Sequence, residues 1–290
     1  MSAILLDGKA LGQKIRQNAK ERAAALKEKG IIPCLAVVLV GNDSASLSYV
    51  KSKEKALAEA GMDSRDIRLP EETSEEELLS IISGLNKDDK VHGILIQSPL
   101  PKHIDEEKAI LSVAPQKDVD CFHPVSVGNA VLERPGFLPC TPHGVLKLLR
   151  EYNIPVCGSH AVIVGRSNIV GKPLASLLVR REYNATVTLC HTGTKDLASY
   201  TLQADILIVA ARNPEFIKAD MVKEGAVVID VGINRVDDPC AKKGYRVCGD
   251  VDPCVAQKAS FFTPVPGGVG PMTIALLLQN VIEAAEAGIA

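Results

Sequence analysis

The sequence has few aromatic residues and no tryptophan. Aromatic residues make up 3% of its 290 residues, whereas hydrophobic residues make up 46%. The core is therefore expected to be mostly aliphatic, as it is in buried parallel sheets. An excess of basic charge is also lacking, because the net charge at pH 7 is −2. This balance argues against a nucleic-acid partner. The length is sufficient for two domains.

Long apolar runs and paired cysteines are absent as well. No run approaches the roughly 18 residues that span a bilayer, and the apolar stretch in Met1–Asp7 is too short for a signal peptide. The eight cysteines include no C-x-x-C pair, and Cys240, Cys248 and Cys254 lack the spacing of metal ligands. The sequence thus predicts reduced cysteines, no metal site, no membrane contact and a cytoplasmic location.

Apolar runs alternate with helical patterns in the first half of the chain. Residues 34–40 and 91–97 read as strands, residues 46–60 as a helix between them, and Thr73–Leu79 as a capped helix start. This rhythm is typical of right-handed βαβ units on a parallel sheet.

A second α/β unit follows a break at Arg134–Pro139. Thr141 is expected to cap a helix that has Pro142 at its first position. The pattern predicts four strands in this unit, at 161–164, 186–190, 205–210 and 226–231. It also predicts a final helix at 271–287.

The segment Gly165–Gly171 stands between a buried strand and a helix start. A helix N-terminus offers unpaired N–H groups and a positive dipole, which suit a phosphate. Ser167 replaces the second glycine of G-x-G-x-x-G, and the acid that usually contacts a ribose 2′-OH is missing, since Glu182 precedes the second strand. With Arg166 nearby, the pattern favours NADP over NAD. A purely structural turn is the alternative.

Four further segments could carry chemistry. Tyr49 and Lys53 share a helix face, and lysine can transfer protons when its surroundings tune it, although a solvated charged face is favoured on spacing alone. Gln97 ends a strand, where ligands of open α/β sheets collect, or it merely ends that strand. Asp120 could accept hydrogen bonds from an N–H-rich heterocycle, or be an ordinary loop acid. The rigid, glycine-rich loop Pro264–Gly270 could approach a ligand closely, or be structural.

Taken together, these segments resemble the bifunctional methylenetetrahydrofolate dehydrogenase/methenyltetrahydrofolate cyclohydrolase family nearly end to end. The motifs that carry the resemblance lie, in the family's order, in Ala45–Lys53, Gly93–Gln97, Lys117–Asp120, Cys140–Gly144, Gly165–Pro173, Asp230–Asn234 and Pro264–Thr273.

The resemblance implies two α/β domains with a cleft between them, the second a Rossmann-like parallel sheet. Residues 1–138 and 271–290 would form the folate-binding catalytic domain, and residues 139–270 the NADP-binding domain. The resemblance also implies a homodimer and a role in one-carbon metabolism that supplies purine biosynthesis.

Residue roles follow from the same resemblance. Tyr49 would stack on the tetrahydrofolate substrate, Lys53 would be the catalytic acid or base, Gln97 would tune Lys53, and Asp120 would hold the pterin. The residues expected near the folate are Pro266, Gly267 and Gly268. The residues expected at the NADP site are Gly165, Arg166, Ser167, Thr192 and Ile233.

The sequence departs from the family's pattern at three positions. Ser98 stands where leucine is usual, Cys121 where glycine is usual, and Thr192 where serine is frequent. Ser98 and Cys121 flank proposed site residues, so they bear on pocket shape, and Thr192 bears on the preference for NADP.

The implied chemistry fits the residues at hand. Oxidising 5,10-methylenetetrahydrofolate leaves a cation that two flanking nitrogens stabilise, so that positioning beside NADP can suffice. Only the hydrolysis to 10-formyltetrahydrofolate demands an acid or base such as Lys53.

Two other functions remain open. A shikimate-dehydrogenase-like enzyme shares the architecture but not the set Tyr49, Lys53, Gln97 and Asp120, and a non-catalytic folate- or nucleotide-binding regulator would rest only on Ser98 and Cys121. A short-chain dehydrogenase is excluded, because its Y-x-x-x-K pair follows the nucleotide loop, whereas here it precedes that loop.

Overall fold

The computed structural model describes residues 3–241 and 244–288. The chain divides into two compact units. We call them the six-stranded unit, made of Met1–Gly12 and Cys140–Thr273, and the three-stranded unit, made of Gln13–Pro139 and Ile274–Ala290. Each is described by itself.

The six-stranded unit is built on a parallel sheet whose strand order is β1-β11-β8-β7-β5-β6. Its strands are β1 (Ile4–Leu5), β5 (His160–Val164), β6 (Thr186–Cys190), β7 (Ile206–Val209), β8 (Val227–Asp230) and β11 (Phe261–Phe262). The other elements of this unit are α6 (Cys140–Glu151), α7 (Gly171–Leu178), α8 (Leu197–Thr201), the 3₁₀ turns η2 (Ala219–Met221) and η3 (Pro253–Gln257), and the antiparallel hairpin of β9 (Asn234–Asp237) and β10 (Tyr245–Cys248).

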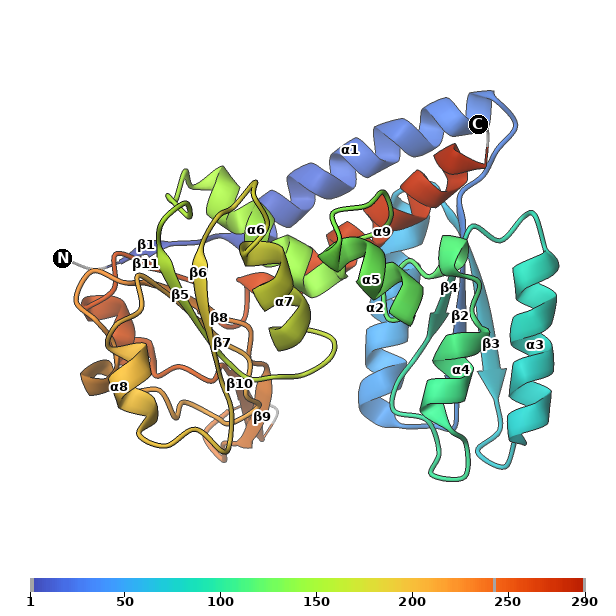
Figure 1. Cartoon of the computed structure of the whole chain (residues 1–290). Helices are drawn as coiled ribbons and strands as arrows, with labels where there is room; N and C mark the ends of the chain where they lie inside the picture. Colours follow the sequence, from blue (N-terminus) through green and yellow to red (C-terminus); the bar gives the residue numbers. More distant parts are fainter. Residues whose placement is uncertain (1–2, 242–243, 289–290) are drawn as a thin grey trace. The chain divides into compact units, whose positions relative to one another are not determined.

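The strand order of this sheet reverses beside β5. The chain passes from β5 to β6 on one side and then returns to β7 on the other side of β5, and Figure 1 shows α7 and α8 on opposite sides of the strands. Ligands of doubly wound sheets bind at such a switch point, outside the carboxyl ends of the strands. The loops that follow β5 and β7 are therefore the expected ligand-binding loops of this unit.

The three-stranded unit has the parallel order β3-β2-β4. Its strands are β2 (Cys34–Val40), β3 (Asp63–Leu69) and β4 (Gly93–Ile96), and its helices and turn are α2 (Ser44–Glu59), α3 (Glu75–Lys87), α4 (Glu106–Ser112), η1 (Pro115–Lys117) and α5 (Pro124–Val131). All seven side chains of β2 are buried, because helices lie on both sides of the strands (Figure 1). Ser74 caps α3 by accepting a hydrogen bond from the Glu77 N–H.

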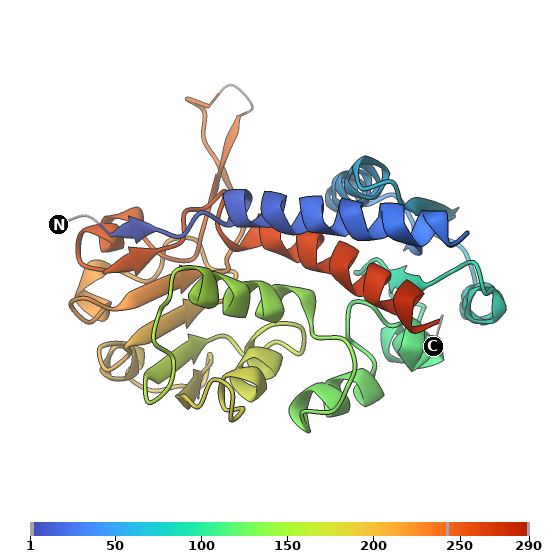
Figure 2. The ribbon, with the colours of Figure 1, turned by 90° about the horizontal axis from the view of Figure 1, so that it is seen from above.

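Two long helices contribute residues to both units. They are α1 (Gly8–Glu28) and α9 (Val269–Ala287), and Figure 2 shows both from above. Within the three-stranded unit, Arg22 of α1 donates two hydrogen bonds to the Glu286 carboxylate of α9. This paired contact ties the two helices together near the end of the described chain.

Three differences from the sequence-based expectation bear on how the two units are built. Residues up to Gly12 group with the six-stranded unit, because β1 pairs with β11. The strand β3 lies at a sheet edge and contains only two apolar residues, Ile67 and Leu69, so no hydrophobic pattern predicted it. The expected cap Thr141 lies inside α6, which begins at Cys140, and its hydroxyl instead bonds the Thr273 hydroxyl at 2.9 Å. Pro142 is tolerated there because N–H groups of a first helical turn have no partner in the helix.

Within the described residues, no helix has the length and apolar character needed to cross a membrane. No three His, Cys, Asp or Glu side chains of the same residues are grouped in a way that could hold a metal ion.

Candidate active site and nucleotide site

Lys53 and Gln97 meet in the three-stranded unit. Lys53 lies on α2 and only 5% of it is exposed, and its ammonium Nζ donates a hydrogen bond of 3.2 Å to Oε1 of Gln97, just beyond β4. The same Nζ lies 4.8 Å from the centre of the Tyr49 ring, one helical turn earlier. Lys53 is therefore in contact with two other predicted site residues, Gln97 and Tyr49.

The charged face of α2 is separate from Lys53. Lys51, Lys55 and Glu59 are exposed, and Lys55 forms a surface ion pair with Glu59. Lys53 instead faces the packed side of the helix. The interpretation of Lys53 as part of a solvated charged face is thus wrong for this residue and right for its neighbours.

The Gln97 amide is oriented by its own loop. While Oε1 accepts from Lys53, Nε2 donates to the Ser98 carbonyl at 2.8 Å. The hydroxyl of Ser98, the residue that replaces a usual leucine, donates to Glu106 of α4 at 2.5 Å. The Ser98 side chain thus bonds a neighbouring helix, and only its backbone takes part in orienting Gln97.

Asp120 follows a tightly packed residue. A Cβ on Gly93 of β4 would come within 2.8 Å of the Val119 side chain, and Asn280 of α9 donates to the Val119 carbonyl at 2.7 Å. Asp120 itself is half-buried, while the buried Asp118 accepts from the backbone N–H groups of the two residues after Cys121. Asp118 therefore stabilises the loop backbone, whereas Asp120 is the acid of this pair that the sequence predicts as the substrate ligand.

The residue after Asp120 has an unusual backbone. Cys121 has φ of +61° and is 1% exposed, and its thiol donates to the Phe137 carbonyl at 3.3 Å. Glycine adopts this left-handed conformation without the steric cost that a Cβ brings. This conformation gives a physical reason for the glycine that is usual in the family at this position.

In the six-stranded unit, Gly165–Gly171 forms the turn between β5 and α7. Gly165 has φ of +124°, and a Cβ there would overlap the backbone carbonyl of Ala210, just after β7. A Cβ on Gly171 would overlap the carbonyl oxygen of Gly165. Ser167, which stands at the place of the missing glycine, accepts a hydrogen bond from the Val170 N–H at 3.2 Å through its hydroxyl and so bridges the turn.

The predicted nucleotide residues stand at the carboxyl ends of three strands of this sheet. Arg166 follows β5, Thr192 follows β6 and Ile233 follows β8, and all three are exposed. The turn 191–195 holds a histidine, a lysine and two threonines but no carboxylate, while Glu182 pairs with Arg150 before β6 begins. A guanidinium and hydroxyls at these strand ends suit a phosphate better than a ribose 2′-OH, and the first acid after β6 is Asp196, just beyond this turn.

The loop Pro264–Gly270 belongs to the same unit and leads into α9. Gly267 has φ of +117°, and the Gly268 N–H closes a turn onto the Pro264 carbonyl at 2.7 Å. The Gly267 carbonyl accepts from the Lys9 N–H at 2.9 Å, which ties the loop to the start of α1. Pro266 is exposed at the tip. The structure thus places Pro266, Gly267 and Gly268 in a different compact unit from Lys53.

The sequence reasoning assigned no role to two buried carboxylates, although Asp230 lies in one of the quoted motifs. Asp230 ends β8 and is 1% exposed, and Asp250 follows β10 and is 0% exposed. Burial raises the pKa of Asp230 to about 6, against three backbone N–H donors that lower it. The available signal was the glycine that lies near each acid, Gly232 and Gly249, because a Cβ on either glycine would overlap one of these carboxylates.

Family comparisons agree with this geometry. The profile of the tetrahydrofolate dehydrogenase/cyclohydrolase catalytic domain matches residues 6–120, and that of the NAD(P)-binding domain of the same family matches residues 139–288. The bifunctional protein FolD of Exiguobacterium sibiricum is 58% identical over 285 residues, which cover 98% of this chain and 100% of that protein.

Solved structures give the same answer. The bifunctional dehydrogenase/cyclohydrolase of Campylobacter jejuni has a TM-score of 0.94 at 52% identity, covering 99% of both chains. The Trypanosoma brucei enzyme, solved with NADP and an inhibitor, has a TM-score of 0.94 at 38% identity, covering 100% of this chain and 99% of that one. Shikimate dehydrogenase of Aquifex aeolicus, at 13% identity and a TM-score of 0.51, shares the fold alone. The chain therefore belongs to the tetrahydrofolate dehydrogenase/cyclohydrolase family.

Proposed function

We propose that this chain oxidises 5,10-methylenetetrahydrofolate to 5,10-methenyltetrahydrofolate with NADP and then hydrolyses the product to 10-formyltetrahydrofolate. The observation that carries the proposal is the buried Lys53–Gln97 pair beside Tyr49, in a chain that also presents a phosphate-type loop at Gly165–Gly171. The first feature supplies an acid or base for hydrolysis, and the second supplies a nucleotide-binding loop for a dehydrogenase.

We propose that the three-stranded unit carries the catalytic side chains and binds the folate, and that the six-stranded unit binds NADP. Tyr49 offers a ring for stacking on the pterin, because 38% of it is exposed. Asp120 accepts the pterin's N–H groups. Pro266, Gly267 and Gly268 are proposed to contact the folate through a backbone that a side chain would otherwise obstruct.

The hydrolytic step falls to Lys53. Water attacks the cationic methenyl carbon, loses a proton, and one carbon–nitrogen bond then breaks as that nitrogen gains a proton. Lys53 Nζ can accept the first proton or deliver the second. Gln97 Oε1 accepts one N–H of Lys53 and so fixes the direction of the amine.

The oxidative step relies on positioning. NADP, when bound, accepts a hydride from the methylene carbon. Arg166 offers its guanidinium to the 2′-phosphate, and Thr192 offers a hydroxyl. The N–H groups of Val170 and Gly171 at the start of α7 donate to the Ser167 hydroxyl and so fix the turn beside Arg166. Ile233 presents an apolar side chain that is 60% exposed.

The test is a spectroscopic assay of the purified chain with methylenetetrahydrofolate and NADP. We expect the absorbance of reduced nicotinamide to grow, and added methenyltetrahydrofolate to disappear without cofactor. Reduction of NADP by shikimate instead would favour the shikimate-dehydrogenase-like alternative. Binding of folate and nucleotide with neither reaction would favour the regulator.

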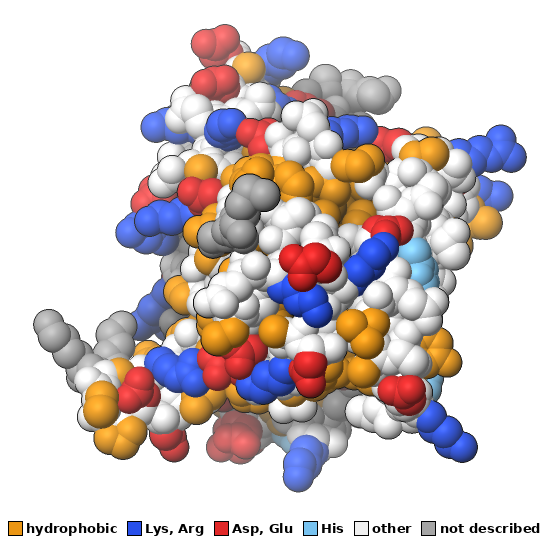
Figure 3. Space-filling model, turned by 90° about the vertical axis from the view of Figure 1, so that its left-hand side faces the viewer, with side chains coloured by type: hydrophobic (Ala, Val, Ile, Leu, Met, Phe, Trp, Pro, Cys, Tyr) orange, Lys and Arg blue, Asp and Glu red, His pale blue; other side chains and the backbone are white. Residues whose placement is uncertain are grey.

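We also propose a homodimer formed through the six-stranded unit. The edge strand β1 exposes 56% of Ile4 and 54% of Leu5, and exposed apolar edge strands are sites of association. Figure 3 shows hydrophobic side chains gathered among charged ones on the side where β1 lies in Figure 1. Light scattering of the purified chain distinguishes a dimer from a monomer.

We place the enzyme in the cytoplasm and expect no nucleic-acid partner. Eight cysteines without a disulfide, five of them buried, suit a reducing compartment, and the net charge of −2 gives no attraction to nucleic acid. Fractionation of cells with an antibody against the chain tests the location.

A further inference from the structure

Asp250 is a buried carboxylate in which both oxygens are fully used. One oxygen accepts from the backbone N–H groups of Ala211 and Arg212 at 2.6 and 3.0 Å. The other accepts from the Asn213 N–H at 2.9 Å and from Nδ2 of Asn234 at 2.7 Å. Four donors thus converge on a side chain that is 0% exposed.

These donors come from two different loops at the carboxyl edge of the six-stranded sheet. Ala211–Asn213 follows β7, and Asn234 follows β8 and begins β9. The first loop is exposed, lies at the switch point of the sheet, and continues from Ala210, whose carbonyl packs against Gly165 of the phosphate-type turn. Asp250 therefore bonds both the loop after β7 and the loop after β8, and these two loops belong to the expected nucleotide site.

The second loop holds Ile233 from both sides. The N–H of Gly232 bonds Asp230 at 2.9 Å, and the Asn234 side chain bonds Asp250. Ile233 itself remains 60% exposed between these two anchors. An apolar side chain that projects from a doubly anchored turn cannot retreat into the core without breaking a buried hydrogen bond.

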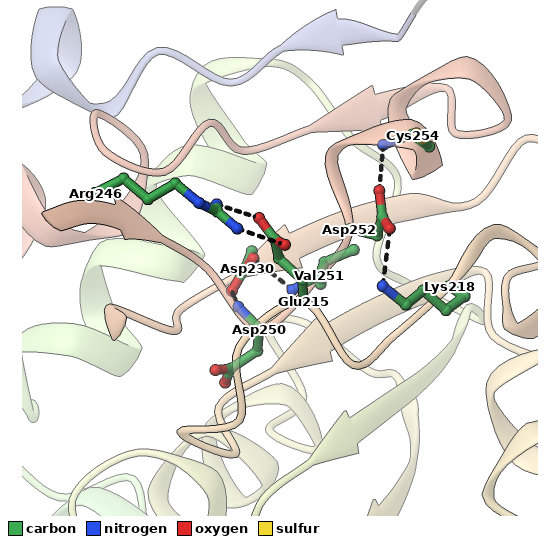
Figure 4. A network of polar contacts seen from close by, with 8 residues as sticks. All are labelled: Glu215, Lys218, Asp230, Arg246, Asp250, Val251, Asp252 and Cys254. Carbon is green, nitrogen blue, oxygen red and sulfur yellow. Dashed lines mark hydrogen bonds and ion pairs between the residues drawn. The ribbon is translucent and has the colours of Figure 1, made fainter. Parts of the chain in front are cut away.

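Asp230 supports Asp250 rather than duplicating it. Its carboxylate accepts from the N–H groups of Asp250 and Val251 at 3.0 and 2.8 Å, as Figure 4 shows. The Asp250 backbone is thereby fixed, and Gly249 and Gly232 leave the space that the two carboxylates fill. The neighbouring ion pairs in Figure 4, Glu215 with Arg246 and Asp252 with Lys218, each join a half-buried carboxylate to an exposed cation, and neither pair includes a residue of Ala211–Asn213 or Gly232–Asn234.

We propose that Asp250 is a positioning residue of the cofactor site, which joins the Ala211–Asn213 loop to the Gly232–Asn234 loop and so holds Ile233 against the dinucleotide. This inference rests on the proposed NADP site and deepens it. In this role the two loops would contact the part of the cofactor that NADP and NAD share, so the effect of replacing Asp250 is expected to be independent of the 2′-phosphate. Arg166, in contrast, reads that phosphate.

The test is the variant Asp250→Asn in the full-length chain. Asparagine has the same shape but turns an NH₂ toward backbone N–H donors, so at least one donor loses its acceptor. We expect the KM for NADP and for NAD to rise together by about tenfold or more, while the cofactor-independent hydrolysis of methenyltetrahydrofolate stays within about twofold of wild type. An unchanged KM for both cofactors overturns the inference.

A second variant keeps the test decisive if Asp250→Asn does not fold. Asn234→Ala removes only the link between Asp250 and the Ile233 loop. It should raise the KM for NADP and the KM for NAD alike. In the double variant with Asp250→Asn, the rise in KM should be smaller than the two single-variant rises multiplied together. A purely structural role predicts lower thermal stability with unchanged KM, which contradicts the proposal.

The matched control is Asp205→Asn. Asp205 also accepts a backbone N–H, that of His160, and pairs with Lys223, but it lies at the amino end of the same sheet. Its loss should leave both KM values unchanged, and a rise as large as that of Asp250→Asn would overturn the assignment. A failure of the nucleotide site itself is distinguishable, because Arg166→Ala would then also leave the KM for NADP unchanged.

Discussion

The Lys53 ammonium points at the Gln97 amide oxygen, 3.2 Å away, from a position that is 95% shielded on the packed face of α2. Burial of a lysine is costly unless its N–H groups find acceptors. A side chain held in this way has a defined direction, which is what proton transfer at a fixed substrate atom requires.

Replacing Lys53 removes the proposed acid or base. We expect Lys53→Met to lower the rate of methenyltetrahydrofolate hydrolysis by about 100-fold or more, since general acid–base catalysis contributes factors of this order. NADP binding, measured by fluorescence titration, should be retained. The control is Lys55→Met, on the exposed face of the same helix, which should hydrolyse at the wild-type rate. Wild-type hydrolysis in the Lys53 variant would refute the role.

Changing the partner of Lys53 should move the pH dependence of hydrolysis. Gln97→Glu places a carboxylate where an amide oxygen now lies, and a neighbouring negative charge stabilises the ammonium form of a lysine. The pH–rate profile should therefore shift toward higher pH, whereas Gln97→Leu should lower the rate without that shift. A profile unchanged in Gln97→Glu would mean that Lys53 does not titrate in the rate-limiting step.

Arg166 should determine the preference for NADP over NAD. We expect Arg166→Ala to raise the KM for NADP about tenfold or more, because a hydrogen bond to a charged group contributes roughly 1.5–3 kcal/mol, and to leave the KM for NAD almost unchanged. Arg181→Ala, an exposed arginine that precedes β6, serves as the control. Equal effects of Arg166→Ala on both cofactors would show that the guanidinium does not read the 2′-phosphate.

Because of the left-handed backbone at Cys121, a glycine variant should be more stable than an alanine variant at this position, the reverse of the usual order. Both Cys121→Gly and Cys121→Ala remove the thiol, but only glycine relieves a Cβ at φ of +61°. We expect the glycine variant to be more stable than the alanine variant by about 1 kcal/mol in urea unfolding. At the buried Cys190 of β6, alanine should be the more stable of the two. If alanine were the more stable substitution at both sites, the Cys121 backbone would not be strained by its Cβ.

Asp230 should give the protein an unusual pH dependence. Its pKa is raised to about 6 from 3.8, so between these values the folded state holds a proton that the unfolded state has lost. Unfolding then releases a proton, and this residue's contribution to stability falls as pH rises.

The measurement is urea unfolding of wild type and Asp230→Asn from pH 4 to pH 6. The stability of wild type relative to the variant should decline by about 1.4 kcal/mol per pH unit over this window. Asp205→Asn should show the opposite sign at lower pH, because the His160 N–H and Lys223 lower the pKa of Asp205. A wild-type advantage that grows from pH 4 to pH 6 would mean that the hydrogen bonds of Asp230 outweigh its burial.

The sequence predicted the parts of the fold that follow a hydrophobic period. The fully buried β2 and the strands β5 to β8 appear at the expected positions, since buried parallel strands are nearly continuous apolar runs. The polar edge strand β3 and the two-residue strand β1 carry no such period. They form because their neighbours provide hydrogen-bonding edges, which no local pattern encodes.

The candidate site was predictable to the same extent. Tyr49, Lys53 and Gln97 were named from motifs, and the structure shows Lys53 in contact with each of the other two. Their roles and that of Asp120 stay predictions. Asp230 and Asp250 could not be recognised, because isolated acids in a sequence are mostly solvated. Only the converging backbone donors in the folded chain distinguish them.

The pairing of β1 with β11 has a consequence for how the polypeptide can be divided. Neither unit corresponds to one continuous stretch of chain, since each draws on two separate segments. A fragment that begins at Cys140 would expose the edge of β11 that β1 covers, and a fragment that ends at Pro139 would lack the portion of α9 that bonds Val119 and Arg22. During synthesis, the unit that holds Lys53 can be completed only after α9 has left the ribosome.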